Sequence, residues 1–169
     1  MNLALSTGPL ATLNSVSATN VDETVKFTAD KAGTGGGYYI SLIGRRTGTS
    51  DYRLKVRIMN GAATAYLVQT LNGTETIVAT QTIPGLTVQP GDVLNLRLRI
   101  TGTGTTTLQA KVWAGNAAEP AAWNLTGTDT AASLQGAGVV GLYSYLSGSA
   151  TNAPVTIRYD DFVVTAATP

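Results

Sequence analysis

The stretch Tyr52-Arg-Leu-Lys-Val-Arg-Ile-Met59 is followed by Asn60-Gly61 and by a second apolar run, Ala65-Tyr-Leu-Val-Gln-Thr-Leu71. In the first run, large apolar side chains alternate with positively charged ones. An alternation of period two predicts a β-strand with one apolar face and one basic face. Asn-Gly between two such runs predicts a hairpin, and residues 62–64 suggest that its loop is longer than two residues.

The rest of the chain repeats this design. Apolar or alternating runs end at Gly, Pro, Asn and Asp roughly every 8–12 residues, a spacing typical of β-sandwiches. Pro84-Gly85 and Pro90-Gly91 predict turns, and Ala114 to Leu134 forms one long connection in which only Ala117 to Ala122 could form a helical turn. We therefore expect an all-β fold of about ten or eleven strands with almost no helix, an antiparallel two-sheet sandwich.

The length of 169 residues suits a single domain spanning 1–169. Residues 1–20 are weakly patterned, and we expect them to form an edge or to contact a partner. Charged residues make up 12% and hydrophobic residues 43% of the chain, which also holds 19 glycines and no cysteine. This composition is typical of a secreted or surface β-protein, so we expect an extracellular location or one at the surface of a cell or virion.

Charge and hydropathy exclude other classes of partner. The net charge of +1 argues against a nucleic-acid binder that relies on overall charge. No apolar run reaches the roughly 18 residues of a membrane span. The first residues have no basic segment followed by an apolar one, so no signal peptide is predicted.

The sequence also argues against an enzyme. Histidine is absent, which excludes Ser-His-Asp and Cys-His catalysis and any His-ligated metal. Glycoside hydrolysis needs two carboxyl groups about 5 to 10 Å apart. Most acids fall in predicted turns, and none forms a Glu-x-Asp pattern, which would place two such groups on one face of a strand. Gly33 to Gly37 lacks the Lys-Ser/Thr pair of a phosphate loop and is expected to be a flexible turn.

The positively charged residues of several strands share one phase of the alternation. If those strands were neighbours in one sheet, they would form a cationic face suited to an anionic polysaccharide. Tyrosine and tryptophan are the usual platforms for the apolar side of a sugar ring. The candidate ligand-binding residues are Arg53, Lys55, Arg57, Arg97, Arg99, Lys111, Trp113, Tyr66, Tyr143 and Tyr145. The plain alternatives are solvated strand cations that discourage edge association and aromatic rings with a structural role.

Several motifs together resemble the laminin-G-like, concanavalin-A-like jelly-roll modules of secreted bacterial and phage proteins. These motifs are Gly44-Arg-Arg46, Tyr52-Arg-Leu-Lys-Val56, Lys111-Val-Trp-Ala-Gly115, Glu119-Pro-Ala-Ala-Trp123, Asp129, Gly138-Val-Val-Gly-Leu142 and Arg158-Tyr-Asp-Asp-Phe162. The resemblance covers residues 21–165 and implies a two-sheet sandwich that is usually non-catalytic. Some such modules bind glycans, and some bind calcium at a loop edge.

One feature departs from that pattern, because such modules usually start with an Asp-Phe strand and a Trp-rich segment that this chain lacks. Either the chain is shortened or something else supplies the edge. No cofactor is expected apart from a structural calcium at Asp160 and Asp161, for which a strand-end role is the plain alternative. Two functions remain open: a carbohydrate-binding module for a polysaccharide or other glycan, and an assembly protein of a phage or cell surface that contacts copies of itself in a homo-oligomer.

Overall fold

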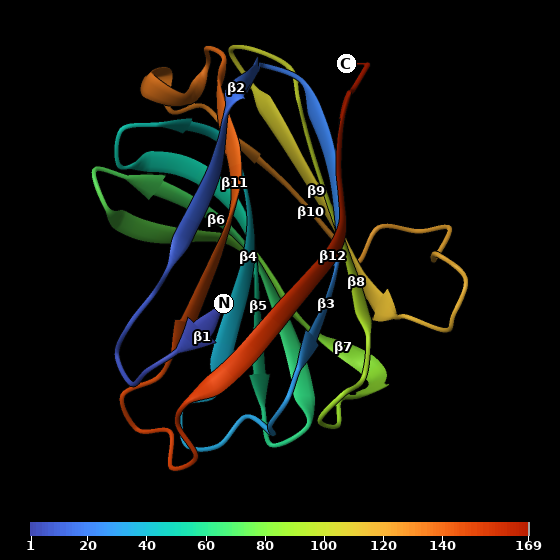
Figure 1. Cartoon of the computed structure of the whole chain (residues 1–169). Coiled ribbons are helices and arrows are strands. Elements are labelled where there is room, and N and C mark those ends of the chain that lie inside the picture. The colour runs from blue at the N-terminus through green and yellow to red at the C-terminus, as the bar shows by residue number, and fades with distance from the viewer. Residues whose placement is uncertain (169) are drawn as a thin grey trace.

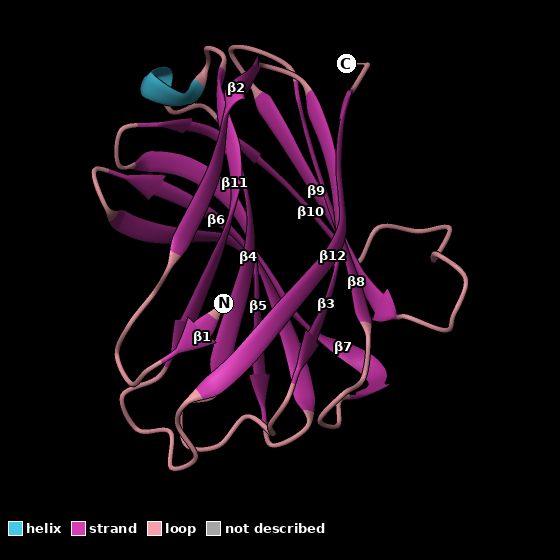
Figure 2. Cartoon of the chain, viewed as in Figure 1, coloured by secondary structure: helices cyan, strands magenta, loops and turns pink. Residues whose placement is uncertain are grey.

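The computed structural model describes residues 1–168, in which the chain folds into two antiparallel β-sheets packed face to face (Figure 1). Figure 2 shows that strands make up nearly all of the regular structure. The elements are β1 (Asn2–Leu3), β2 (Leu10–Ala18), β3 (Val21–Ala29), β4 (Tyr38–Thr47), β5 (Ser50–Met59), β6 (Ala62–Leu71), β7 (Thr74–Thr87), β8 (Leu94–Thr101), β9 (Thr106–Ala114), β10 (Leu125–Asp129), the 3-10 helix η1 (Ala132–Leu134), β11 (Gly138–Leu146) and β12 (Val155–Ala166). The predicted all-β sandwich is confirmed, with twelve strands.

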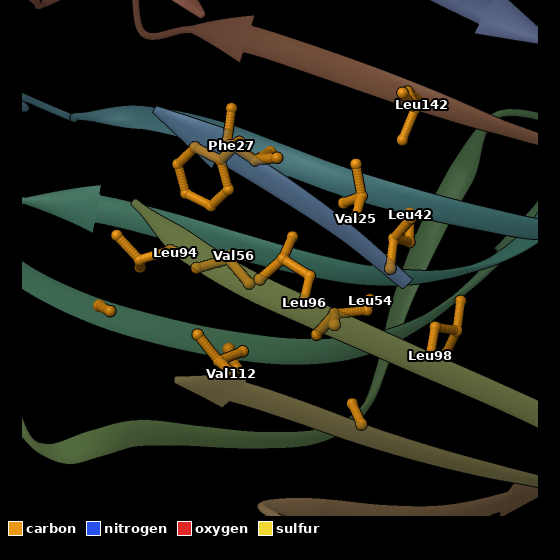
Figure 3. Close-up of a cluster of buried hydrophobic side chains, with 14 of the residues drawn as sticks. Val25, Phe27, Leu42, Leu54, Val56, Leu94, Leu96, Leu98, Val112 and Leu142 are labelled. Atoms are coloured by element: carbon orange, nitrogen blue, oxygen red, sulfur yellow. The ribbon is translucent and has the colours of Figure 1, made fainter. Parts of the chain in front are cut away.

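Each sheet contains six strands. The β3 sheet has the order β1-β12-β3-β8-β9-β10, and the β5 sheet has the order β2-β11-β4-β5-β6-β7. Figure 3 shows buried side chains of the core, among them Val25, Phe27 and Leu96 from the β3 sheet and Leu54 and Val56 from the β5 sheet. Burial of each such side chain stabilises the fold by about 1.5–3 kcal/mol, so this apolar layer holds the sheets together.

Strand β5 lies inside its sheet, between β4 and β6, and its apolar side chains alternate inward as predicted. The loop to β6 has only two residues, Asn60 and Gly61, and Met59 pairs directly with Ala62. Asn60 and Gly61 have φ values of 50° and 79°, the conformation of the two-residue turns that match the twist of a hairpin. The expectation of a longer loop is wrong, because residues 62–64 already pair with β5.

Pro84-Gly85 is not a turn between strands. Strand β7 runs through both residues to Thr87, and its register against β6 shifts there. Gly85 adopts a φ of 71°, and proline, which has no N–H to donate, is tolerated at such irregularities of an edge strand. The chain turns instead over residues 88–93.

The N-terminal segment contributes an edge strand to each sheet. Strand β1 pairs with β12, and β2 pairs with β11. Residues 2–18 therefore pair within their own sandwich, at the outer edge of each sheet. In Figure 1, β1 is the short dark blue arrow beside the N label, and β2 is the blue strand that runs up to the top of the view.

The long connection after β9 carries its own structure. Residues 115–124 form the loop that projects from the side of the molecule in Figure 1, and β10 and η1 follow it. Residues 117–122, the one part of this connection that could form a helical turn, are not helical, and a 3-10 turn forms instead at Ala132–Leu134. No helix within residues 1–168 has the length and apolar character needed to cross a membrane.

Candidate functional site: the outer face of the β5 sheet

The predicted basic residues lie on two opposite faces of the sandwich. Arg53, Lys55 and Arg57 belong to β5, whereas Arg97 and Arg99 lie on β8 of the other sheet, which also carries Lys111 on β9. The expectation of one continuous cationic surface is therefore wrong. Alternation within a strand shows which side chains point outward, but it does not show which sheet the strand joins.

Four tyrosines surround the β5 cations on the outer face of the β5 sheet. In the ladder, Arg57 of β5 is opposite Tyr39 of β4, and Lys55 of β5 is opposite Tyr66 of β6. Strand β11 adds two more tyrosines in the same phase, because its Tyr145 is opposite Tyr39. We call this surface the tyrosine–cation face; its residues are Tyr39, Arg53, Lys55, Arg57, Tyr66, Tyr143 and Tyr145.

The rings and cations of this face touch one another. Lys55 Nζ lies 5.8 Å from the centre of the Tyr39 ring and 5.7 Å from that of Tyr66. The guanidinium carbon of Arg53 lies 5.3 Å from the Tyr143 ring centre. The ring centres of Tyr39 and Tyr145 lie 5.9 Å apart, and the ring planes are inclined by 53° to each other. Cation–π and aromatic contacts at these distances hold the side chains in one arrangement before any ligand arrives.

Two carboxylates neutralise part of the charge on this face. Arg53 Nε donates to Asp51 at 2.6 Å, its Nη1 donates to Glu75 at 3.2 Å, and Lys55 also pairs with Glu75. Burial by itself would lower the pKa of Arg53, but the hydrogen bond and charge of Asp51 and the charge of Glu75 outweigh it and raise that pKa. Arg53 therefore remains charged, and Glu75 adds acceptor oxygens beside the rings.

A surface of this kind can hold a sugar. The apolar side of a pyranose can pack on a tyrosine ring, while its hydroxyl groups need donors and acceptors nearby. Lys55 offers a donor between Tyr39 and Tyr66, and Glu75 offers acceptors next to it. The face thus combines ring platforms with both kinds of hydrogen-bonding group.

Two cations of the β3 sheet, Arg97 and Lys111, form ion pairs with carboxylates of the chain itself. Arg97 Nε and Nη2 donate to the two oxygens of Asp22 at 2.8 and 2.7 Å. Arg97 Nη1 and Lys111 Nζ both donate to Glu119 Oε1 at 2.7 Å, and Lys111 Nζ lies 4.6 Å from the centre of the Trp123 ring. Burial would raise the pKa of Glu119, but these two donors lower it. These contacts hold the 115–124 loop on the outer face of β8 and β9.

The remaining β3-sheet candidates stand apart from the tyrosines. Arg99 Nη2 donates to the carbonyl oxygen of Thr168 at 2.6 Å. Trp113 is half-buried and lines a small groove of about 240 Å³ with Pro120 and Asn124. The structure therefore brings together only six of the ten candidates, those on β5, β6 and β11.

A larger cleft lies at one end of the β3 sheet. It encloses about 960 Å³ and is lined by residues that include Lys26, Asp92, Asn116 and Arg158. None of the tyrosine–cation residues lines it, nor does any of the predicted aromatic platforms. Its volume suits a small ligand. Its aromatic lining residues are the buried Phe27 and the half-buried Tyr159, whose hydroxyl group bonds to Ser144.

The geometry gives no support to a calcium site at Asp160 and Asp161. Asp161 lies at a bulge of β12 with a φ of 51°, and one of its carboxylate oxygens accepts from Lys26 Nζ at 2.6 Å. Asp160 Oδ1 accepts from the backbone N–H of Asp161 at 2.9 Å. Across the described residues, no group of three or more His, Cys, Asp or Glu side chains is placed to hold a metal.

Tyr39 of the tyrosine–cation face and Glu75, which pairs with Arg53 and Lys55 on that face, are not among the sequence-based candidates. Tyr39 follows the buried Tyr38, and only its phase within β4 marks it as outward-facing. Glu75 is the second residue of β7, just after the Asn72-Gly73 turn. The signal that singles them out is pairing, because β4 and β7 flank β5 and β6 in the sheet.

Comparisons with known proteins agree with the fold. No protein-family model matches the sequence, and no curated protein matches it either. The family suggested by the motifs is therefore not confirmed.

Solved structures with the same architecture include carbohydrate-binding module CBM66 from Bacillus subtilis, with a TM-score of 0.60, 13% identity and coverage of 90% of this chain and 78% of that chain. A xylan β-1,4-xylosidase from Bacillus halodurans matches with a TM-score of 0.55 and 16% identity over 87% of this chain and 28% of the enzyme. The CBM2 module of the Lactobacillus casei BL23 phage J-1 evolved Dit matches with a TM-score of 0.51 and 9% identity over 90% of this chain and 66% of that chain. At these identities the likeness establishes the β-sandwich fold.

Proposed function

We propose that the protein is a non-catalytic carbohydrate-binding module that holds a glycan on the tyrosine–cation face. The observation that carries the proposal is the position of Lys55 between the Tyr39 and Tyr66 rings, with Glu75 paired to it. Ring platforms next to paired donors and acceptors are what a polyhydroxylated ligand requires. The fold shared with CBM66 supports the same function.

Binding without catalysis agrees with the carboxyl groups of this face. Asp51 is fully buried and held by Arg46 and Arg53, and Glu75 is held by Arg53 and Lys55. Both carboxyl groups are thus engaged in ion pairs with cations of the same sheet. A module of this type acts where polysaccharides occur, outside the cell or at the surface of a cell or virion.

The test is glycan-array screening followed by calorimetric titration of the best ligand. Tyr39→Ala and Tyr66→Ala should each weaken binding about tenfold, since a stacked ring contributes about 1–1.5 kcal/mol. Trp113→Ala is the matched control, because it removes an aromatic side chain from the outer face of the other sheet. It should leave the affinity unchanged, and circular dichroism should show native unfolding curves for all three variants.

Three results would contradict the proposal: no glycan binds, both tyrosine variants bind as well as the wild type, or only Trp113→Ala loses binding. Light scattering on the same samples gives the oligomeric state. An oligomer that binds no glycan would favour the assembly role instead.

A further inference from the structure

Two loops meet at the end of the tyrosine–cation face near Arg57. One spans residues 31–37 and the other spans residues 147–152. The backbone N–H of Gly36 donates to Ser149 Oγ at 2.8 Å, and the hydroxyl groups of Ser147 and Ser149 lie 3.0 Å apart. The first loop therefore presents its backbone to two serine hydroxyls at the rim of the β5 sheet.

Close packing holds the glycine loop in place, in contrast to the expected flexible turn. A Cβ atom on Gly35 would lie 2.0 Å from the carbonyl oxygen of Ser149, and one on Gly36 would lie 2.1 Å from Ser147 Oγ. A Cβ on Gly33 would lie 2.2 Å from the carbonyl oxygen of Ile58 in β5. Only glycine lets the loop approach these groups so closely, and the corner is thereby pre-formed.

Arg57 extends into this corner. Its Nε donates to the carbonyl oxygen of Gly36 at 2.8 Å, and its guanidinium carbon lies 5.7 Å from the centre of the Tyr39 ring. Its Nη2 contacts Met59 Sδ at 2.8 Å. These contacts orient the guanidinium group without neutralising it.

Arg57 differs in this respect from the other half-buried cations of the sheet, whereas Arg45 is fully buried and bonds to carbonyl and hydroxyl oxygens. Arg46 and Arg53 pair with Asp51, and Lys55 pairs with Glu75. No carboxylate within residues 1–168 forms an ion pair with Arg57, and its Nη1 has no hydrogen-bond acceptor there. The positive charge that remains on this surface is therefore concentrated at one end, next to the serine hydroxyls.

We infer that this corner binds the oxyanion group of an acidic glycan, a carboxylate or a sulfate ester, while the sugar ring that carries it lies on Tyr39 and Tyr145. The inference rests on the proposed function. A planar guanidinium pairs well with either oxyanion, and the hydroxyl groups of Ser147 and Ser149 can donate to its remaining oxygens. The ligand would thus be an acidic polysaccharide whose charge lies at the Arg57 end.

The experiment uses two pairs of probes that differ in charge: oligogalacturonate with its methyl ester, and laminarin sulfate with laminarin. At least one acidic probe should bind the wild type about tenfold or more tightly than its neutral counterpart. Arg57→Gln should lower the affinity for that acidic probe to the affinity for its neutral counterpart. Arg57→Lys, which keeps the charge, should restore part of the preference for the acidic probe. Raising the salt concentration should reduce the wild-type preference for the acidic probe over the neutral one, because salt screens the charge of Arg57. In Arg57→Gln, salt should change the two affinities little.

Arg158→Gln is the matched control, because Arg158 is an exposed arginine on β12 of the other sheet and takes part in none of the observed ion pairs of the described chain. It should keep the preference for the acidic probe. Ser149→Ala is a second variant of the corner that leaves the charge unchanged and should weaken only the acidic probe.

The inference fails if acidic and neutral probes bind alike, if no acidic probe binds, or if Arg57→Gln weakens both members of a pair equally. In the first and third cases the neutral probes still bind, so the proposed function survives without the acidic specificity. If no glycan on the array binds at all, the proposed function fails as well.

Discussion

Replacing Glu23 by glutamine is expected to change how stability depends on pH. Glu23 points inward from β3, in phase with Val21 and Val25, and is 0% exposed. Neither carboxyl oxygen has a hydrogen-bond partner among the described residues. A Cβ atom on Gly44 of β4 would lie 2.8 Å from Glu23 Oε1, so the carboxyl group packs against the opposite sheet. Burial, with a smaller contribution from the charge of Asp22, raises its pKa well above 4.5.

The sign follows from the proton that the folded state retains. The unfolded chain releases it near pH 4.5, whereas folded Glu23 keeps it to a higher pH. The contribution of Glu23 to stability is therefore greatest below pH 4.5 and falls as the pH rises toward the folded-state pKa, by up to about 1.4 kcal/mol per pH unit. Three acids have lowered pKa values, so they change the stability at lower pH than Glu23 does: Asp30, Glu119 and Asp129. The chain has no histidine, so no histidine changes the stability at higher pH.

The assay is urea unfolding at a series of pH values from 4 to 8. The wild type and Glu23→Gln should have similar stability at pH 4, because a neutral carboxyl and an amide both leave buried polar atoms unpaired, at a cost of about 1–3 kcal/mol. The variant should become progressively more stable than the wild type as the pH rises. A difference that is constant across the series would refute the reasoning, because it would mean that Glu23 does not change protonation on folding.

Two further variants test other parts of the sandwich. Glu119→Gln should destabilise the fold by about 0.5–1 kcal/mol at neutral pH, the range of a partly exposed ion pair. Because Lys111 and Arg97 lower the pKa of Glu119 in the folded state, this loss of stability should vanish as the pH falls below 4.5. A loss that grows toward acid pH in urea unfolding would contradict this. Gly61→Ala should cost about 1–2 kcal/mol in thermal unfolding because its φ is 79°. Gly136→Ala, which meets nothing within 4 Å and lies outside the left-handed region, should be neutral, and equal costs for the two glycines would contradict the strain argument.

Pattern in the sequence is sufficient to locate strands such as β5 and to show which of their side chains face outward. Alternation in 52–59 identifies Arg53, Lys55 and Arg57 as outward-facing, and the structure agrees. Asn60-Gly61 marks a hairpin because two consecutive positive φ values are easiest for these residues. Local signals were misleading at Pro84-Gly85, where pairing with β6 carries the strand through residues that favour a turn.

The buried Glu23 shows another limit of pattern. In the run from Val21 to Ala29 it occupies an inward position, but an acid there could equally indicate a strand end or a paired charge. Only the packing of β3 against β4 shows that its carboxyl group is enclosed and has no partner within the described chain. The same packing makes it a titrating group of the core.

The sequence by itself determined that this protein is a β-sandwich without histidine or cysteine chemistry, because alternation and composition are local properties of the chain. Only the tertiary structure decided which strands are neighbours. Strand order depends on hydrogen bonds between distant segments and on burial shared by all strands, so no single stretch encodes it. That order separates Arg57 from Arg97 and Lys111, and it places Tyr39 beside Arg57 on the face where we propose that the glycan binds.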